Sequence, residues 1–187
     1  MAIRPCADLS SSGWISDSEL PWQRLVSMGP SGFAAYARLR FIPDPLHPGQ
    51  SENEVEVGPD GPSEHQRLLA ALEVLGRHTS TPDDVCYGIW DGWGWSPQGY
   101  DEGDPPALRM PYRSYHLLQG ALADFGSWHL PDPAFVWPAD HAWCLADDVD
   151  PHYAGIGASE AAIAELLERP GLDVVRADPS VEQPAYR

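Results

Sequence analysis

The sequence predicts an α+β fold: one loop-rich domain over residues 1–187, in which a largely antiparallel mixed sheet carries two main helices packed on it. Three observations support this prediction. Short apolar runs with strand character outnumber helical segments, and most connections are too short for helical crossovers. The 17 glycines and 20 prolines favour many short elements joined by turns. Hydrophobic residues make up 43% of the chain, which is enough for a sizeable core.

The first part of the chain is expected to supply one strand and one main helix. Residues 1–30 form a peripheral N-terminal segment that wraps the domain, and residues 32–41 have the alternation of a strand. Residues 43–62 are rich in Pro, Gly and acid, which predicts a flexible acidic loop. Ser63 and Gln66 have capping-box spacing, so a helix is expected to begin there. Leucines at helical spacing form its apolar face: Leu68, Leu69, Leu72 and Leu75.

A β-hairpin is predicted next. A strand over residues 85–90 leads into an Asp-Gly pair, the dipeptide favoured in two-residue turns, and a return strand ends at Trp95. In such a hairpin the indoles of Trp90, Trp93 and Trp95 share one surface. We expect this surface to belong to the core, because aromatic rings dominate core burial. The alternative is a ligand-binding platform on which a small molecule stacks.

The remaining residues are expected to form mostly strands. A second flexible acidic loop covers residues 96–106. A short helix is expected near residues 120–126. Ser159 caps a second amphipathic helix that stops at the Pro-Gly pair starting at residue 170. The glycines in the preceding run GIGAS are expected to serve turn geometry, since Glu160 would repel a phosphate there. The expected strands are 108–119 (interrupted near Pro111), 135–137, 141–149, 153–157 and 172–175.

Charge restricts the classes of partner. The formal net charge is −17, and all 11 basic residues are arginines, so the chain has no lysine. Such a surface repels phosphate groups, which disfavours nucleic acids and anionic membranes as partners. A basic protein is the more natural partner. Without lysine the chain has neither a Walker A lysine nor a Schiff-base lysine.

Cysteine usage and the N-terminus favour a cytoplasmic protein. The three cysteines, Cys6, Cys86 and Cys144, have no paired spacing, which argues against a disulfide framework. No signal peptide and no membrane-spanning run is expected. Cys144 lies three residues after His141, an odd offset that places the two on opposite faces of a strand. We therefore expect Cys144 to be a core residue rather than a nucleophile.

A candidate metal site lies at the end of the strand predicted for residues 141–149. Asp148, Asp150 and His152 are spaced i, i+2, i+4, and an extended chain points all three to one side. Clustered carboxylates suit Mg²⁺ or Mn²⁺, and a histidine favours a transition metal. The alternative is a solvated strand exit that turns at Pro151. We expect this alternative, and no cofactor is predicted.

The run WPADHAWC (137–144) and its neighbours have a distinctive pattern. They resemble a family of actinobacterial proteins for which no activity is established. The run WPADHAWC is typical of that family, although an arginine usually stands where His141 stands here, and a Thr-Glu pair where Asp147 and Asp148 stand. The resemblance implies a cytoplasmic α/β domain, and it assigns no activity because none is established for the family. The general layout is also similar to small acidic immunity proteins of the SUKH type. The runs that carry the family resemblance are GFAAYARL (32–39), VLGRHTSTPDDVCYGIWDGWGW (74–95), LRMPYRSYHLLQGAL (108–122) and VWPADHAWCLADDVD (136–150).

Three classes of function follow from these features. The first is a soluble, non-catalytic acidic protein that binds a basic protein partner, which the net charge favours. The second is a small metal-dependent enzyme that uses Asp148, Asp150 and His152. The third is a small-molecule binder that uses the tryptophan-lined face. The sequence favours them in this order.

Overall fold

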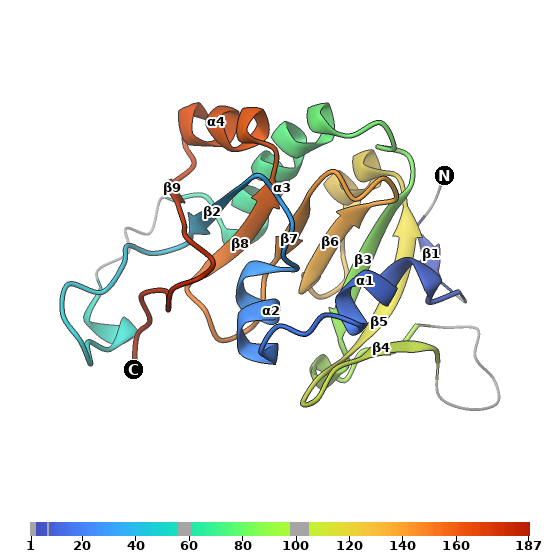
Figure 1. The fold of residues 1–187 in the computed structure, drawn as a ribbon, viewed down its shortest axis with the longest axis horizontal. Helices are drawn as coiled ribbons and strands as arrows, with labels where there is room; N and C mark the ends of the chain where they lie inside the picture. Colours follow the sequence, from blue (N-terminus) through green and yellow to red (C-terminus); the bar gives the residue numbers. More distant parts are fainter. Residues whose placement is uncertain (1–2, 7, 56–60, 98–104) are drawn as a thin grey trace.

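The computed structural model describes residues 3–6, 8–55, 61–97 and 105–187 (Figure 1). The strands are β1 (Arg4–Pro5), β2 (Ala35–Arg40), β3 (Val85–Trp90), β4 (Ala107–Arg109), β5 (Ser114–Gly120), β6 (Phe135–Pro138), β7 (Cys144–Ala146), β8 (Tyr153–Ala158) and β9 (Val174–Arg176). The α-helices are α1 (Gly13–Ser16), α2 (Trp22–Met28), α3 (Glu64–Leu75) and α4 (Glu160–Glu168). Short 3₁₀ helices lie at Ser10–Ser12, Glu52–Glu54, Gly76–His78, Asp91–Trp93 and Leu122–Ser127.

The described strands form one sheet in the order β1-β5-β3-β6-β7-β8-β2-β9, and β4 also pairs with β5. Each pairing between these strands is antiparallel, so the parallel component of the predicted mixed sheet is not found among them. The predicted α+β class, with a largely antiparallel sheet and two main helices, is confirmed.

Local sequence signals set the starts of both main helices. The Ser63 hydroxyl accepts from the backbone N–H of Gln66, and the Gln66 side chain accepts from the backbone N–H of Ser63 at 2.8 Å. This reciprocal capping box begins α3 where the sequence predicts it. At α4, the Ser159 hydroxyl accepts from the backbone N–H of Ala162 at 3.2 Å. Both helices pack on the same face of the sheet (Figure 1).

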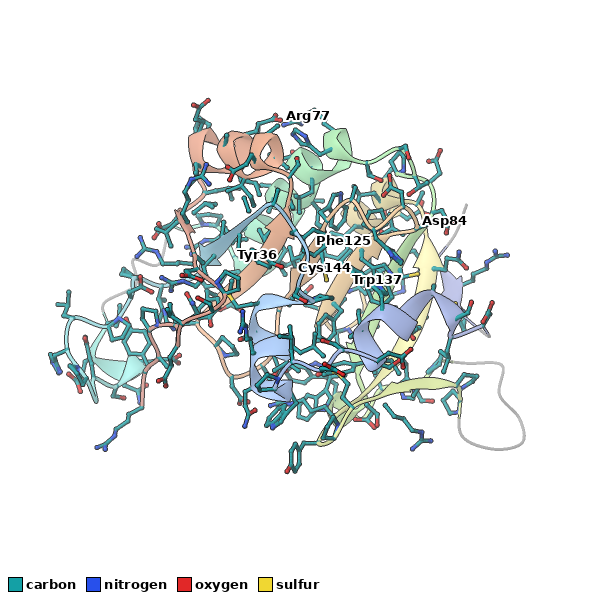
Figure 2. All side chains as sticks on the ribbon, viewed as in Figure 1. Tyr36, Arg77, Asp84, Phe125, Trp137 and Cys144 are labelled. Atoms are coloured by element: carbon teal, nitrogen blue, oxygen red, sulfur yellow. The ribbon has the colours of Figure 1, made fainter. Side chains whose placement is uncertain are left out.

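The sheet is buried on both faces because alternate residues of its strands point to opposite sides. In β3, Tyr87 and Ile89 contact the core beneath α3 and α4, whereas Cys86 contacts a second core beneath α1 and α2. Ile15 of α1 and Leu25 of α2 are fully or almost fully buried in this second core. The N-terminal segment therefore packs on the second face of the sheet. Trp137 and Cys144, labelled in Figure 2, belong to the same core.

The glycines of the run GIGAS lie inside β8, so the predicted turn at this place is wrong. A Cβ on Gly155 would lie 2.2 Å from the carbonyl oxygen of Ser27 in α2. A Cβ on Gly157 would lie 2.3 Å from the ring of Phe33. Both glycines are needed because the chain that covers the second face approaches the β8 backbone closely.

The two predicted acidic loops are described in part. Residues 56–60 and 98–104 lie outside the described residues, so their predicted flexibility stays a prediction. In the first loop, the 3₁₀ helix Glu52–Glu54 begins with a capping box, and the backbone N–H of Arg187 donates to the Gln50 carbonyl at 3.0 Å. The chain terminus is thereby attached to this loop. Within the described ranges, no helix has the length and apolar character needed to cross a membrane.

The close contact at Gly155 predicts a large cost for a small substitution. Gly155→Ala is expected to lower the free energy of unfolding by roughly 1–3 kcal/mol or more, since the added methyl group meets backbone atoms that have little freedom to move. Gly126→Ala is the control, because a Cβ there meets no atom within 4 Å. Chemical denaturation measures both. Equal stabilities of the two variants would contradict the packing of α2 on β8.

Candidate functional site

A cavity of about 530 Å³ lies at one edge of the sheet. Its wall comes from distant parts of the sequence, and antiparallel pairing explains why. The end of β3 lies beside the start of β6, and that start lies beside the end of β7. The end of β7 in turn lies beside the start of β8, which lies beside the end of β2. The segments that adjoin these strand ends therefore meet at one edge.

Acidic side chains dominate the lining of this cavity. The described lining residues include no arginine, and the chain has no lysine. Elsewhere, surface arginines are paired with acids of their own: Arg77 with Glu165, and Arg176 with Glu160. Negative charge is thus concentrated at the cavity. The acids that line it are Glu52, Glu64, Asp132, Asp147, Asp148 and Asp150.

Asp147 is the most unfavourably placed of these acids. The side chain is half-buried, and desolvation of its carboxyl, together with the charges of Glu64, Asp132 and Asp148, raises the pKa of Asp147 well above its ordinary value. No hydrogen bond or ion pair from the described residues reaches the Asp147 carboxylate. Burial and the charge of Asp132 also raise the pKa of Glu64. Arg67 lies near Glu64, and His65 Nδ1 lies 2.6 Å from Asp132 Oδ1, whereas Asp147 has no such partner among the described residues.

Asp148 and Asp150 share one guanidinium group. Arg113 Nη1 donates to Asp148 Oδ1 at 2.8 Å, and Arg113 Nη2 donates to Asp150 Oδ2. The same guanidinium lies over the ring of Trp90, with its Cζ 4.8 Å from the ring centroid. Burial nevertheless raises the pKa of Asp148, although Arg113 opposes this shift. Arg113 therefore offsets part of the charge behind the cavity wall.

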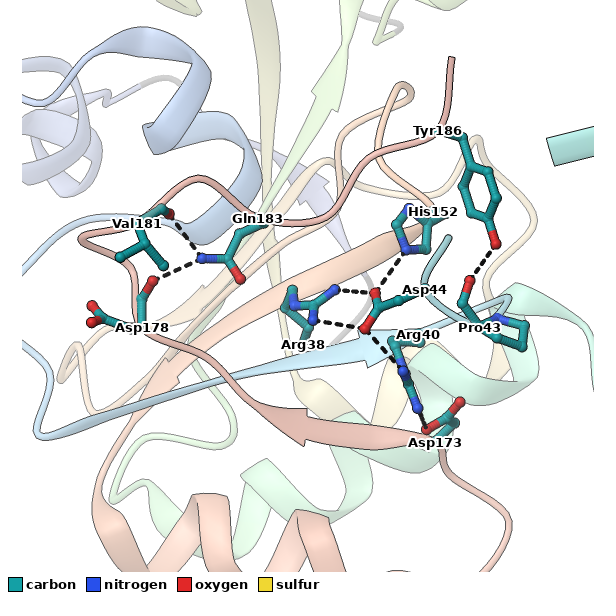
Figure 3. Close-up of polar contacts among 10 residues, drawn as sticks. All are labelled: Arg38, Arg40, Pro43, Asp44, His152, Asp173, Asp178, Val181, Gln183 and Tyr186. Carbon is teal, nitrogen blue, oxygen red and sulfur yellow. Dashed lines mark hydrogen bonds and ion pairs between the residues drawn. The ribbon is translucent and has the colours of Figure 1, made fainter. Parts of the chain in front are cut away.

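His152 belongs to a second ionic cluster (Figure 3). Its Nε2 lies 3.1 Å from Asp44 Oδ1, and Asp44 also accepts hydrogen bonds from Arg38 and Arg40. Burial alone would raise the pKa of Asp44, but the bonds from Arg38 and His152 hold this pKa well below its ordinary value. Arg40 continues to Asp173 at 2.7 Å. This cluster fixes the loop that follows β2 against the start of β8.

The predicted metal set does not converge. Asp148 and Asp150 form ion pairs with Arg113, whereas the imidazole of His152 contacts the carboxylate of Asp44. The strand predicted over 141–149 is limited to β7, and bends at residues 149–152 replace the extended chain that the spacing argument requires. Among the described residues, no group of three or more His, Cys, Asp and Glu side chains is arranged to hold a metal ion.

The predicted tryptophan hairpin is wrong. β3 is already paired with β5 on one side and with β6 on the other, so no return strand can pair with it after residue 90. Residues Asp91–Trp93 form a 3₁₀ helix instead. The indoles are consequently separated: Trp90 contacts the second core, Trp95 contacts the first, and Trp93 is 54% exposed at the cavity. The expected core position of Trp93 is corrected accordingly.

Four cavity acids lie outside the predicted metal set. Glu52, Glu64 and Asp132 are far from residue 147 in sequence, and the tertiary fold brings their segments together at this cavity. Two local signals were available: Glu64 is the first residue after a helix cap, and Asp147 directly follows a buried strand. Strand order was needed to place both at one edge.

Comparison with protein-family models, with curated proteins and with solved structures gives no match to this chain. The resemblance to an actinobacterial family and to SUKH-type immunity proteins therefore stays an expectation from the sequence. The residues and geometry of the cavity are therefore the basis for a functional proposal.

The exposure of Trp93 predicts a small effect on stability. Trp93→Ala is expected to lower the free energy of unfolding by less than about 1 kcal/mol, because about half of its surface already faces solvent. Trp143→Ala, in which a fully buried indole is removed, is expected to cost roughly 3–5 kcal/mol. Urea denaturation compares the two. A loss at Trp93 as large as that at Trp143 would show that the Trp93 ring is buried in solution.

The raised pKa of Asp147 predicts a stabilising substitution. In the native state this carboxyl holds its proton to a higher pH than in the unfolded chain, so stability is complete below the unfolded pKa and is lost as pH rises through the native pKa. Asp147→Asn removes this loss and is expected to raise the free energy of unfolding at pH 7.

Denaturation at two pH values tests this expectation. The stabilisation by Asp147→Asn should vanish below about pH 4, where the carboxyl is protonated in both states. Glu168→Gln, which removes an exposed charge far from the cavity lining, is the matched control and should have little effect at either pH. A destabilised Asp147→Asn variant at pH 7 would contradict the unpaired, desolvated carboxylate.

Proposed function

We propose that this chain is a soluble, non-catalytic acidic protein that binds a basic protein partner at the cavity. The main support is the set of six carboxylates around one cavity, in which Asp147 is partly desolvated and has no partner among the described residues. A protein that keeps such charge together loses stability by it, and retention of that cost is typical of a binding site. A cationic group from a partner would remove the cost.

The overall charge supports the same proposal. A net charge of −17 attracts cationic partners from a distance, and a concave, acid-lined surface focuses that attraction. Complementary charge mainly gives specificity and fast association. It also disfavours nucleic acids and anionic membranes. A cytoplasmic location fits Cys6, Cys86 and Cys144, all of which are buried and unpaired.

A small-molecule binder is the second candidate. A separate cavity of about 730 Å³ lies between the indoles of Trp95 and Trp128, with Ile3 and Leu118 in its wall. Its volume and apolar lining suit a small ligand. The metal-dependent enzyme has less support, because Asp148 and Asp150 share Arg113 whereas His152 pairs with Asp44.

Binding of cationic peptides tests the proposal. Hexa-arginine and hexa-lysine are titrated into the protein by calorimetry, and at least one should bind. A cavity variant that removes three charges should bind about 10-fold more weakly or worse. A control variant removes three exposed acids outside the cavity lining and should retain most of the affinity. The cavity variant is Glu52→Gln, Glu64→Gln and Asp147→Asn; the control is Glu19→Gln, Glu168→Gln and Glu182→Gln.

Because both variants have the same net charge, the comparison separates the cavity from the general acidity of the chain. Equal affinities of the two variants for both peptides would overturn the proposal. Binding should also weaken as NaCl rises from about 0.05 M to about 0.5 M, since salt screens exposed charges.

A further inference from the structure

Trp93 differs from the tryptophans of the core because its ring is exposed at the cavity. Trp93 is 54% exposed, whereas Trp137 and Trp143 are fully buried. It lines the cavity together with the six carboxylates. An exposed aromatic face beside several anions is suited to an organic cation, because the face of the ring carries negative potential and the anions add to it.

The molecule contains an internal example of this arrangement directly beside the cavity. The Arg113 guanidinium lies over Trp90 and donates to Asp148 and Asp150. The rings of Trp90 and Trp93 meet edge to face, with centroids 5.8 Å apart. Trp90 thus has a guanidinium in contact with its ring and two carboxylates bound to that guanidinium. Trp93 lines the cavity together with the carboxylates, and no arginine of the described residues lines that cavity.

A second observation points to a missing partner. The Asp147 side chain is half-buried in the cavity wall, and its carboxylate has no hydrogen-bond donor among the described residues. A partly desolvated carboxylate without a donor is unfavourable. A guanidinium matches it well, because its planar fork donates two parallel hydrogen bonds to one carboxylate and also stacks on an aromatic ring. An ammonium group lacks both properties.

We propose that the cavity is an arginine-binding pocket that holds one arginine side chain of the basic partner, with its guanidinium on the Trp93 ring and paired with Asp147. This inference rests on the proposed function. It narrows the expected ligand from a basic protein surface in general to the side chain of arginine. The cavity volume of about 530 Å³ is sufficient for a single long side chain. Glu64 and Asp132 supply further negative charge around the same position.

The test compares three blocked tripeptides, Gly-Arg-Gly, Gly-Lys-Gly and Gly-citrulline-Gly, by NMR titration of the indole N–H signals. The arginine peptide should bind at least about 3-fold more tightly than the lysine peptide. The citrulline peptide, which keeps the shape and loses the charge, should show no saturable shift. The Trp93 indole signal should move on binding.

Variants separate stacking from charge. Trp93→Ala should weaken binding of the arginine peptide about 5-fold while the protein stays folded, because the ring is exposed. Asp147→Asn should weaken it further. Tyr112→Ala removes another exposed ring, 74% exposed and outside the cavity lining, and should leave the affinity unchanged.

The failures of this inference and of the proposed function are distinguishable. Equal binding of the arginine and lysine peptides, with no effect of Trp93→Ala, would overturn the arginine pocket. If the hexapeptides still discriminate the cavity variant from its control, the acidic binding site stands. If they do not, the proposed function fails and the arginine pocket fails with it.

Discussion

Antiparallel pairing from β3 through β6, β7 and β8 to β2 is the constraint on which the rest of this molecule depends. It makes successive strands end and begin at one edge, so segments far apart in sequence meet there. In this chain those segments carry Asp132, Asp147, Asp148 and Asp150. The close approach of α2 to Gly155 fixes the second face of the same strands. The antiparallel strand order therefore determines both the packing of the sheet and the position of the acidic cavity.

Several of the clustered acids have basic partners within the chain, including Asp132, whose Oδ1 lies 2.6 Å from His65 Nδ1. Arg113 forms ion pairs with Asp148 and Asp150, and Arg38 and Arg40 form ion pairs with Asp44. Asp147 has no such partner among the described residues. Arginine is thus the chain's own means of pairing clustered acids. An arginine supplied from outside would give Asp147 the same kind of partner.

Features governed by local signals are predictable from the sequence, and features governed by strand order are not. The capping box of Ser63 and Gln66 acts over three residues, so the start of α3 follows from the sequence. The Asp-Gly hairpin signal is also local, but both edges of β3 are taken by β5 and β6, and tertiary pairing overrides it. The spacing of Asp148, Asp150 and His152 assumes an extended chain, and the bends after β7 remove that assumption. The meeting of Glu64 with Asp147 depends on topology alone.

The most direct test of this account is the titration of the Asp147 carboxyl by ¹³C NMR, in the free protein and with the arginine tripeptide bound. The account predicts that the pKa of Asp147 in the free protein is well above the ordinary aspartate value, because of desolvation and the charges of Glu64, Asp132 and Asp148. It also predicts that this pKa falls when the guanidinium binds, since a nearby cation favours the ionised form. An ordinary pKa of about 4 in the free protein, unchanged by the peptide, would contradict the account.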